Sequence, residues 1–264
     1  MKFASIAGVT IAYCVTGPTA ASVIAFANSL GTDLRIWDDV VPVLSPNYRV
    51  LTYDMRGHGL SDVPTGPYAI DDHVGDLMGL ADHLGIDDVA LAGVSVGGVV
   101  VQAAASRHAA RVRALVLCDT AARIGIDALW NDRIATVTEH GTAAIADSIM
   151  ERWFSPAFRR DRPAECAGWR NLLVAASRDG YAATCATLRD TDLTAEVASI
   201  SAPTLVVVGE HDLSTPPDLV RSTAALIAGA RFEIIRGAGH IPSIEQPEKL
   251  AALIADFLKD VGYV

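Results

Sequence analysis

The stretch Gly93-Val94-Ser95-Val96-Gly97 closes an apolar, strand-like run that begins at Val89, and it opens a helical run from Gly98 to Ala110. A serine flanked by glycines two positions away, between a strand and a helix, predicts a sharp turn with a strained backbone. The small residues let neighbouring chain pass close to the turn, and the Ser95 hydroxyl points out of the sheet. The same five residues also fit a plain small-residue turn that happens to hold a serine, so the rest of the chain must decide.

Short apolar runs rich in β-branched residues alternate with helical stretches along most of the chain. Runs of this kind are typical of parallel strands that helices cover on both faces. The helical stretches include Asp71 to Gly85 and Gln246 to Lys259, and the N-terminus is expected to form a first pair of strands. The sequence therefore predicts an α/β fold with a mostly parallel, doubly wound sheet. The predicted parallel strands are Ser22–Asn28, Tyr48–Tyr53, Val89–Val94, Val112–Cys118, Thr204–Val208 and Phe232–Ile235.

The alternation stops between roughly residues 121 and 200, where no strand is convincing and several helical segments are rich in Arg and Trp. This segment interrupts the series of strands after one strand and before the next. We therefore expect residues 1–120 and 201–264 to form the α/β core and residues 121–200 to form an inserted helical cap.

Composition and charge narrow the classes of partner. Hydrophobic residues make up 51% of the chain, which argues against disorder. The net charge of -10, from 21 basic and 31 acidic residues, gives no general attraction to phosphate backbones or anionic membranes. We therefore expect no binding to nucleic acid or to a membrane surface.

The compartment is predicted from the N-terminus and the cysteines. The first residues lack the long apolar region of a signal peptide, and the apolar run from Val89 to Ala105 is too short and too polar for a membrane span. The four cysteines are scattered without a CxxC spacing, which predicts reduced thiols in the cytoplasm and no metal site. The oligomeric state stays open, and a homo-oligomer is compatible with the sequence.

Three residues in the order Ser, Asp, His follow predicted strands. A serine hydroxyl needs a base to take its proton and an acid to orient that base. Ser95, Asp212 and His240 each come just past the carboxyl end of a strand, where sites form in open α/β sheets. We predict that they are the nucleophile, the orienting acid and the base. Asp212 also fits a loop acid or a helix cap, and Asp54, after an earlier strand, is the rival acid.

Four longer segments carry a resemblance to a known family. The triad order resembles the α/β-hydrolase fold superfamily, and the segments look like those of 3-oxoadipate enol-lactonases over nearly the whole chain. Val96 departs from the methionine that this family more often has after the serine, which changes pocket shape rather than mechanism. The segments are Asn28-Ser-Leu-Gly-Thr-Asp-Leu-Arg-Ile-Trp37, Tyr53-Asp-Met-Arg-Gly-His-Gly-Leu-Ser61, Leu117-Cys-Asp-Thr-Ala-Ala-Arg-Ile-Gly125 and Glu151-Arg-Trp-Phe154.

Two backbone N–H groups are needed to bind the oxyanion of a tetrahedral intermediate. Val96, directly after the serine, is expected to supply one of them. Hydrolases of this fold often have His-Gly-X where this chain has Asn28-Ser29-Leu30, so Leu30 is the expected second donor, although Gly31 also fits a plain turn there. The loop at His58 is expected to be a structural turn that shapes the pocket floor.

The resemblance implies hydrolysis of an enol-lactone with an acetate arm to 3-oxoadipate, in the β-ketoadipate route of aromatic degradation. This reaction needs no cofactor. Ser95 would attack the ring carbonyl with His240 as base, the ring oxygen would leave as an enol, and water would release the second carboxylate.

An anionic substrate that approaches an acidic protein needs a local cation. Residues 121–198 hold 9 of the 18 arginines and no lysine, so a cap arginine is the natural partner of a substrate carboxylate. We predict that Arg133 and Arg152 bind it, with Trp130 and Trp153 as apolar walls. The same segment holds 11 acidic residues, so most of its arginines are expected to be paired at the surface.

Two other functions are compatible with parts of the pattern, and a third is disfavoured. A carboxylesterase of the same fold that acts on a neutral ester would share the whole triad. A ligand receptor with a vestigial pocket need not keep all three residues. A haloalkane dehalogenase is disfavoured, because its chemistry places an aspartate where this chain has Ser95.

Overall fold

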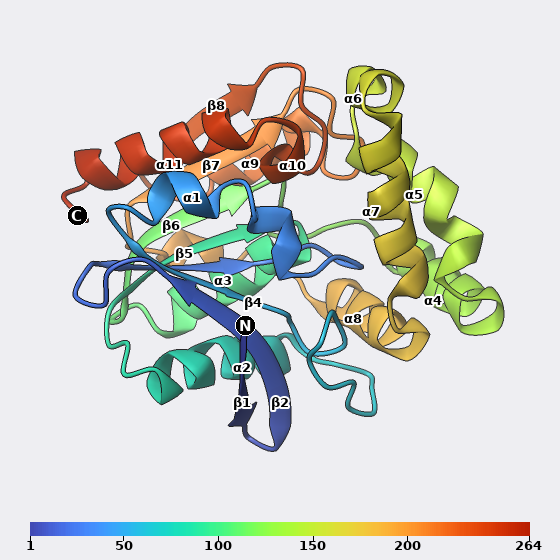
Figure 1. The fold of residues 1–264 in the computed structure, drawn as a ribbon, viewed down its shortest axis with the longest axis horizontal. Coiled ribbons are helices and arrows are strands. Elements are labelled where there is room, and N and C mark those ends of the chain that lie inside the picture. Colours follow the sequence, from blue (N-terminus) through green and yellow to red (C-terminus); the bar gives the residue numbers. More distant parts are fainter.

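The computed structural model describes residues 1–264 and has one eight-stranded sheet in the order β1-β2-β4-β3-β5-β6-β7-β8 (Figure 1). The first two strands form an antiparallel pair, β2 also pairs antiparallel with β4, and all other neighbours are parallel. The mostly parallel sheet that the sequence predicts is therefore confirmed. The strands are β1 (Lys2–Ile6), β2 (Val9–Thr16), β3 (Val23–Ala27), β4 (Arg49–Tyr53), β5 (Val89–Val94), β6 (Val112–Cys118), β7 (Thr204–Gly209) and β8 (Arg231–Ile235).

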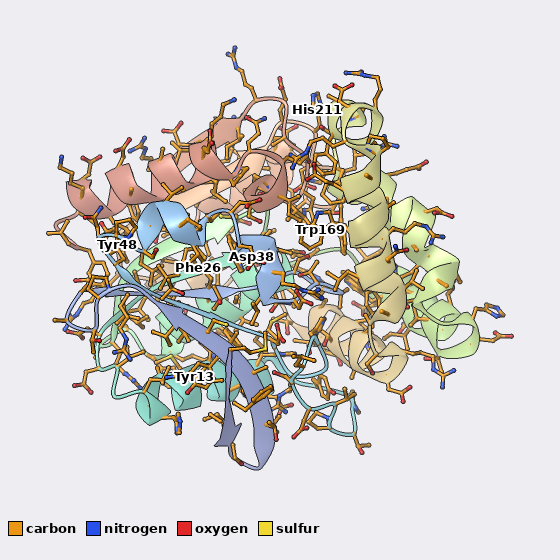
Figure 2. All side chains as sticks on the ribbon, viewed as in Figure 1. Tyr13, Phe26, Asp38, Tyr48, Trp169 and His211 are labelled. Carbon is orange, nitrogen blue, oxygen red and sulfur yellow. The ribbon has the colours of Figure 1, made fainter.

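Helices cover the sheet on both faces. Every residue of β3, β5 and β7 is therefore buried. Phe26 of β3 lies inside this layer, with its ring centroid 4.7 Å from that of Trp37 (Figure 2). The helices of the core are α1 (Val41–Leu44), α2 (Ile70–His83), α3 (Val96–Arg107), α9 (Pro217–Ala224), α10 (Pro242–Glu245) and α11 (Pro247–Asp260).

The predicted elements match the observed ones closely. The six predicted parallel strands begin and end within one residue of the observed strands. The helix predicted to run to Gly85 ends at His83, because Gly85 takes a φ of +64° that terminates a helical turn.

All chain between β6 and β7 is helical or irregular. Figure 1 shows these helices gathered at one side of the molecule, beyond the carboxyl ends of the strands. We call them the cap helices: α4 (Asp127–His140), α5 (Ala146–Trp153), α6 (Pro156–Asp161), α7 (Pro163–Ala175) and α8 (Arg178–Asp190). No helix of the protein has both the length and the apolar character needed to cross a membrane.

The turn between β5 and α3 is held by the ends of the two neighbouring strands, β3 and β6. Ser95 has a φ of +58°, a left-handed conformation that is uncommon for a residue with a side chain. Its N–H donates to the carbonyl of Cys118 at 3.1 Å, and its carbonyl accepts from the Thr120 hydroxyl at 2.7 Å. A Cβ on Gly97 would lie 2.4 Å from the carbonyl oxygen of Ala27, so only glycine lets α3 begin this close to β3.

We expect Gly97→Ala to lower the free energy of unfolding by about 1–3 kcal/mol, because the new methyl group forces a shift of the backbone at the end of β3. Gly168→Ala is the matched control, since Gly168 lies inside α7 and a Cβ there meets nothing within 4 Å. That change should raise stability by about 0.5–1 kcal/mol. Urea denaturation of both variants measures the difference, and equal midpoints would contradict the close approach at Gly97.

Candidate active site

One cavity of about 70 Å³ lies where the turn after β5 faces the cap helices. The residues predicted from the sequence gather at this cavity, although they come from five separate parts of the chain. Val96 follows the cavity residue Ser95 directly, and Asp212 lies behind His240. The predicted residues that line the cavity themselves are Leu30, Ser95, Trp130, Arg133, Arg152, Trp153 and His240.

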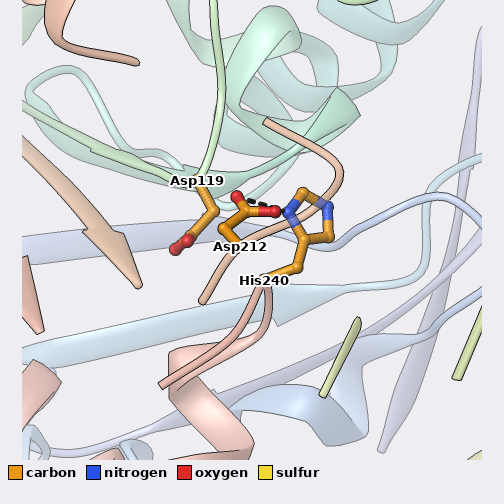
Figure 3. A group of neighbouring side chains, drawn as sticks. All are labelled: Asp119, Asp212 and His240. Atoms are coloured by element: carbon orange, nitrogen blue, oxygen red, sulfur yellow. Dashed lines mark hydrogen bonds and ion pairs between the residues drawn. The ribbon is translucent and has the colours of Figure 1, made fainter. Parts of the chain in front are cut away.

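Asp212 and His240 form a buried hydrogen-bonded pair. His240 Nδ1 lies 2.9 Å from Asp212 Oδ2, with side-chain exposures of 2% and 0% (Figure 3). A carboxylate can only accept, so Nδ1 carries the proton and donates it. The second ring nitrogen, Nε2, then keeps its lone pair and points away from Asp212 (Figure 3). His240 is therefore held in the tautomer that can take a proton from a hydroxyl.

The hydrogen bonds around Asp212 keep it ionised. Burial by itself raises the pKa of this carboxyl, but His240 and the hydrogen bonds from Thr215 outweigh burial and hold it below its usual range. Oδ1 accepts from the N–H groups of Ser214 and Thr215 at 2.7 and 3.0 Å, and Oδ2 accepts from the Thr215 hydroxyl at 2.6 Å. The neighbouring His211 points to the exterior instead, at the edge of the molecule (Figure 2).

The loop that carries His240 is fixed to the cap. The His240 N–H donates to the carbonyl of Trp153, the last residue of α5, at 2.8 Å. Glu245 of α10 accepts from the Gly239 N–H at 2.7 Å and from the Ser155 hydroxyl at 2.6 Å. A movement of α5 would therefore shift the backbone of His240.

Two amide N–H groups are free next to Ser95. The N–H of Leu30 donates no hydrogen bond within the protein, and Val96 begins α3, where first-turn N–H groups have no partner inside the helix. Asn28 shapes the loop of Leu30, because its side-chain amide donates to the Thr32 carbonyl at 2.7 Å. The loop lies against the turn after β5 through the close approach of Gly97. One donor directly follows the serine and the other lies in the loop after an early strand, as the oxyanion hole of this kind of site requires.

Arg133 and Arg152 are the arginines that face the cavity, and neither has a carboxylate partner. Arg133 Nη1 donates to the Tyr181 hydroxyl at 3.3 Å, and its guanidinium carbon lies 5.8 Å from the centroid of the Trp130 ring. Burial and the charge of Arg133 lower the pKa of Arg152 from its ordinary value. Six other cap arginines form ion pairs with acidic residues: Arg123, Arg160, Arg162, Arg170, Arg178 and Arg189.

The rival acid, Asp54, forms hydrogen bonds to backbone N–H groups and none to His240. Its two oxygens accept from the backbone N–H groups of Leu34 and Leu60, each at 2.8 Å. It lines a second cavity of about 360 Å³ that also contains His58, but neither Ser95 nor His240 lines that cavity. Burial raises the pKa of Asp54 and lowers that of His58. Both residues therefore support the loops behind the catalytic cavity.

Sequence reasoning missed two residues at this site. Tyr181 of α8 gives Arg133 its hydrogen bond, and no local pattern marks it. Asp119 directly follows β6 and lies beside Asp212 and His240, with one possible ligand atom of each within 4.8 Å of the others (Figure 3). The rule that found Asp212, an acid just past a strand, also fits Asp119. Aspartate and histidine can bind metal ions, but the Asp212 oxygens and His240 Nδ1 are already used in hydrogen bonds with one another and with Ser214 and Thr215.

The arrangement can carry out acyl transfer. A hydroxyl on a strained turn, a histidine in the proton-accepting tautomer, an ionised buried acid and two free N–H donors meet at one cavity. The two unpaired arginines add positive charge to the same space. The chemistry therefore suits a carbonyl substrate that also carries an anionic group.

Comparison with known proteins places the chain among hydrolases. The family described as alpha/beta hydrolase fold matches residues 23–247. The chain is 34% identical over 240 residues to 3-oxoadipate enol-lactonase 2 of Acinetobacter baylyi, covering 91% of this chain and 90% of that protein. It superimposes on the crystal structure of an enol-lactonase from Burkholderia xenovorans LB400 with a TM-score of 0.95, at 39% identity over 98% of this chain and 100% of that one. A malate-bound thermophilic esterase from Thermogutta terrifontis gives a TM-score of 0.92, at 30% identity over 97% and 95%.

We expect Ser95→Ala to lower kcat for a short aryl ester on the order of 10⁶-fold, because the covalent route is lost while the fold remains. His240→Ala should be comparably damaged, and the double variant should lose little more than either single one, since the two residues act as a unit. Steady-state rates with folding checked by circular dichroism measure this. Losses that multiply in the double variant would show that the two residues act separately.

Asp212→Asn should cost less than Ser95→Ala, on the order of 10⁴-fold in kcat, because Asp212 orients His240 without bonding to substrate. The matched variant Asp54→Asn removes a buried carboxylate that holds loops, so it should lower thermal stability and leave most of the activity. Aryl-ester assays and thermal unfolding of both variants decide the assignment. Full activity in Asp212→Asn with collapse of activity in Asp54→Asn would reverse it.

Proposed function

This chain belongs to the α/β-hydrolase fold family and is a hydrolase enzyme, and from this premise we propose that it opens 3-oxoadipate enol-lactone to 3-oxoadipate. The reaction is a step of the β-ketoadipate route of aromatic degradation. The proposal makes Ser95 the nucleophile, His240 the base and Asp212 the acid that orients it.

The observation that carries the proposal is the pair of unpaired arginines in the catalytic cavity. Most cap arginines are neutralised at the surface, whereas Arg133 and Arg152 keep their charge beside Ser95. Like charges that line one cavity repel each other unless an anion binds beside them. A substrate with a free carboxylate supplies that anion, and an arginine fork binds a carboxylate with two parallel hydrogen bonds. The names of the similar lactonases support the same substrate class.

In the proposed mechanism, Ser95 Oγ attacks the lactone carbonyl while His240 Nε2 takes its proton. Asp212 stabilises the imidazolium, and the N–H groups of Leu30 and Val96 bind the oxyanion. The ring C–O bond then breaks, and the ring oxygen leaves as an enol that takes the proton from His240 and becomes a ketone. Water then gives a proton to His240 and attacks the acyl carbon, and the bond to Ser95 Oγ breaks as Oγ takes that proton back from His240. The new carboxylic acid loses its proton to solvent. The balance closes with one water consumed and no cofactor.

The size of the cavity suits a small substrate. The cavity of about 70 Å³ is small, so substrate binding requires at least that the side chains lining it rearrange. Trp130 and Trp153 give the cavity apolar walls against which a flat five-membered ring can pack. A long acyl chain would need a much larger displacement.

A carboxylesterase that acts on neutral esters is the second candidate, because the similar protein from Thermogutta terrifontis is an esterase. The triad serves both reactions equally. The two functions differ in what Arg133 and Arg152 contribute, since a neutral ester gains nothing from a cation. The relative kcat/KM for enol-lactone and for a neutral aryl ester therefore separates them.

We expect Arg133→Leu to weaken binding of the enol-lactone by about 1.5–3 kcal/mol, the usual contribution of a hydrogen bond to a charged group, and to raise KM roughly 10- to 100-fold. Arg152→Leu should act in the same direction. Hydrolysis of a neutral aryl ester should change little in either variant, because the ester makes no ion pair.

Arg170→Leu is the matched control, because Arg170 is a cap arginine that pairs with Asp147 outside the cavity. It should leave KM for both substrates unchanged. Equal losses on the anionic and the neutral substrate in an Arg133 or Arg152 variant would mean that the cap was disturbed, and would remove that arginine from substrate binding.

A further inference from the structure

Asp119 occupies an unusual position directly after β6. It is fully buried, and its φ of +46° is left-handed, which costs free energy in a residue with a side chain. Its N–H donates to the Val207 carbonyl at 2.8 Å, and its Oδ1 accepts from the Gly209 N–H at 2.7 Å. The side chain is thus held against the end of β7, because Gly209 is the last residue of that strand and lies three residues before Asp212.

The second oxygen of Asp119 has no hydrogen-bond partner. Oδ2 is buried and accepts no hydrogen bond, so an ionised oxygen there would be very costly. A protonated carboxyl can instead donate to the neighbouring Asp212 carboxylate. The carboxyl lies in a cluster with Asp212 and His240 (Figure 3). The structure therefore places a second carboxyl beside the acid–base pair with no cation to neutralise it.

Only one of the two neighbouring carboxyls can readily be ionised. The titratable groups that face Asp119 are Asp212, His240, Glu245 of α10 and its chain neighbour Cys118. Asp212 has His240 and three further hydrogen bonds to hold its charge. Burial, and next the charge of Asp212, raise the pKa of Asp119 well above its usual range. Asp119 therefore keeps its proton while Asp212 is ionised.

We propose that Asp119 is a positioning residue of the catalytic site, a reserve acid that stays neutral while Asp212 orients His240 and that ionises to stabilise His240 when the Asp212 charge is removed. Its proton then goes to solvent, and its carboxylate supplies the negative charge that the imidazolium needs. The inference rests on the serine-hydrolase mechanism proposed above but not on the lactone substrate, so a neutral aryl ester is the right probe.

The test compares Asp212→Ala with the double variant Asp212→Ala/Asp119→Asn between pH 6 and pH 8.5. Alanine is used at position 212 because asparagine would donate to His240 Nδ1 and fix the wrong tautomer. Asparagine at position 119 keeps an oxygen for the Gly209 N–H. We expect the ratio of kcat/KM of the single variant to that of the double variant to rise with pH, from about one to roughly tenfold, as Asp119 ionises. The titration of His240 is common to both variants and cancels in the ratio.

Asp212→Ala/Asp54→Asn is the control, because it also replaces a buried carboxyl, but one that supports loops away from His240. Any loss that it causes should be the same at every pH. A ratio for Asp119 that does not change with pH, or a double variant as active as Asp212→Ala, would overturn the proposal. Ester hydrolysis that is unchanged in Ser95→Ala would instead overturn the serine mechanism itself.

A second measurement needs no variant at position 212. In protein labelled with ¹³C at the aspartate carboxyls, we expect one resonance at the chemical shift of a protonated carboxyl at pH 7, and this resonance should be missing in Asp119→Asn. If all aspartates of the wild-type protein are ionised at pH 7, Asp119 does not hold the proton and the proposal fails.

Discussion

The close contact of backbone at the turn between β5 and α3 is the constraint on which the site depends. Gly97 lets the start of α3 touch the end of β3. Ser95 is held in a left-handed conformation because its N–H donates to Cys118 at the end of β6 and its carbonyl accepts from Thr120 just after that strand. These contacts tie three strands together at their carboxyl ends. They set the Ser95 hydroxyl, the Val96 N–H and the loop of Leu30 in one place, so the proposed nucleophile and the proposed oxyanion donors are positioned before any substrate binds.

Charge at the site is divided between the sheet and the cap. The loops after β6 and β7 contribute two buried carboxyls, Asp119 and Asp212, and the cap contributes two cations, Arg133 and Arg152. In a protein with a net charge of -10, this arrangement gives the cavity a local attraction for anions that the rest of the surface lacks. The hydrogen bond from His240 to the end of α5 links the two halves. The proposed base on the sheet and the arginines of the cap therefore belong to segments that are joined by a backbone hydrogen bond.

The two candidate acids show that the role of a buried carboxyl depends on which groups donate hydrogen bonds to it. Asp54 and Asp212 both follow strands, and both are buried. Asp54 has two backbone N–H groups and no histidine, so it stabilises loops. Asp212 has His240 as well, so its charge is available to an imidazolium. Asp119 accepts from one N–H and has one oxygen that accepts no hydrogen bond, and on that difference rests the proposal that it is a reserve acid.

The sequence by itself determined the alternation of strands and helices, the strained turn at Ser95, and the order in which Ser95, Asp212 and His240 follow their strands. These features are local, since apolar period and glycine spacing act over a few residues. It could not show which cap arginines lack acidic partners, that Tyr181 supports Arg133, or that Asp119 lies beside Asp212. Those facts depend on contacts between segments far apart in the chain, and only the tertiary structure decided them, because the charge and pKa of a buried group are set by whichever distant residues pack against it.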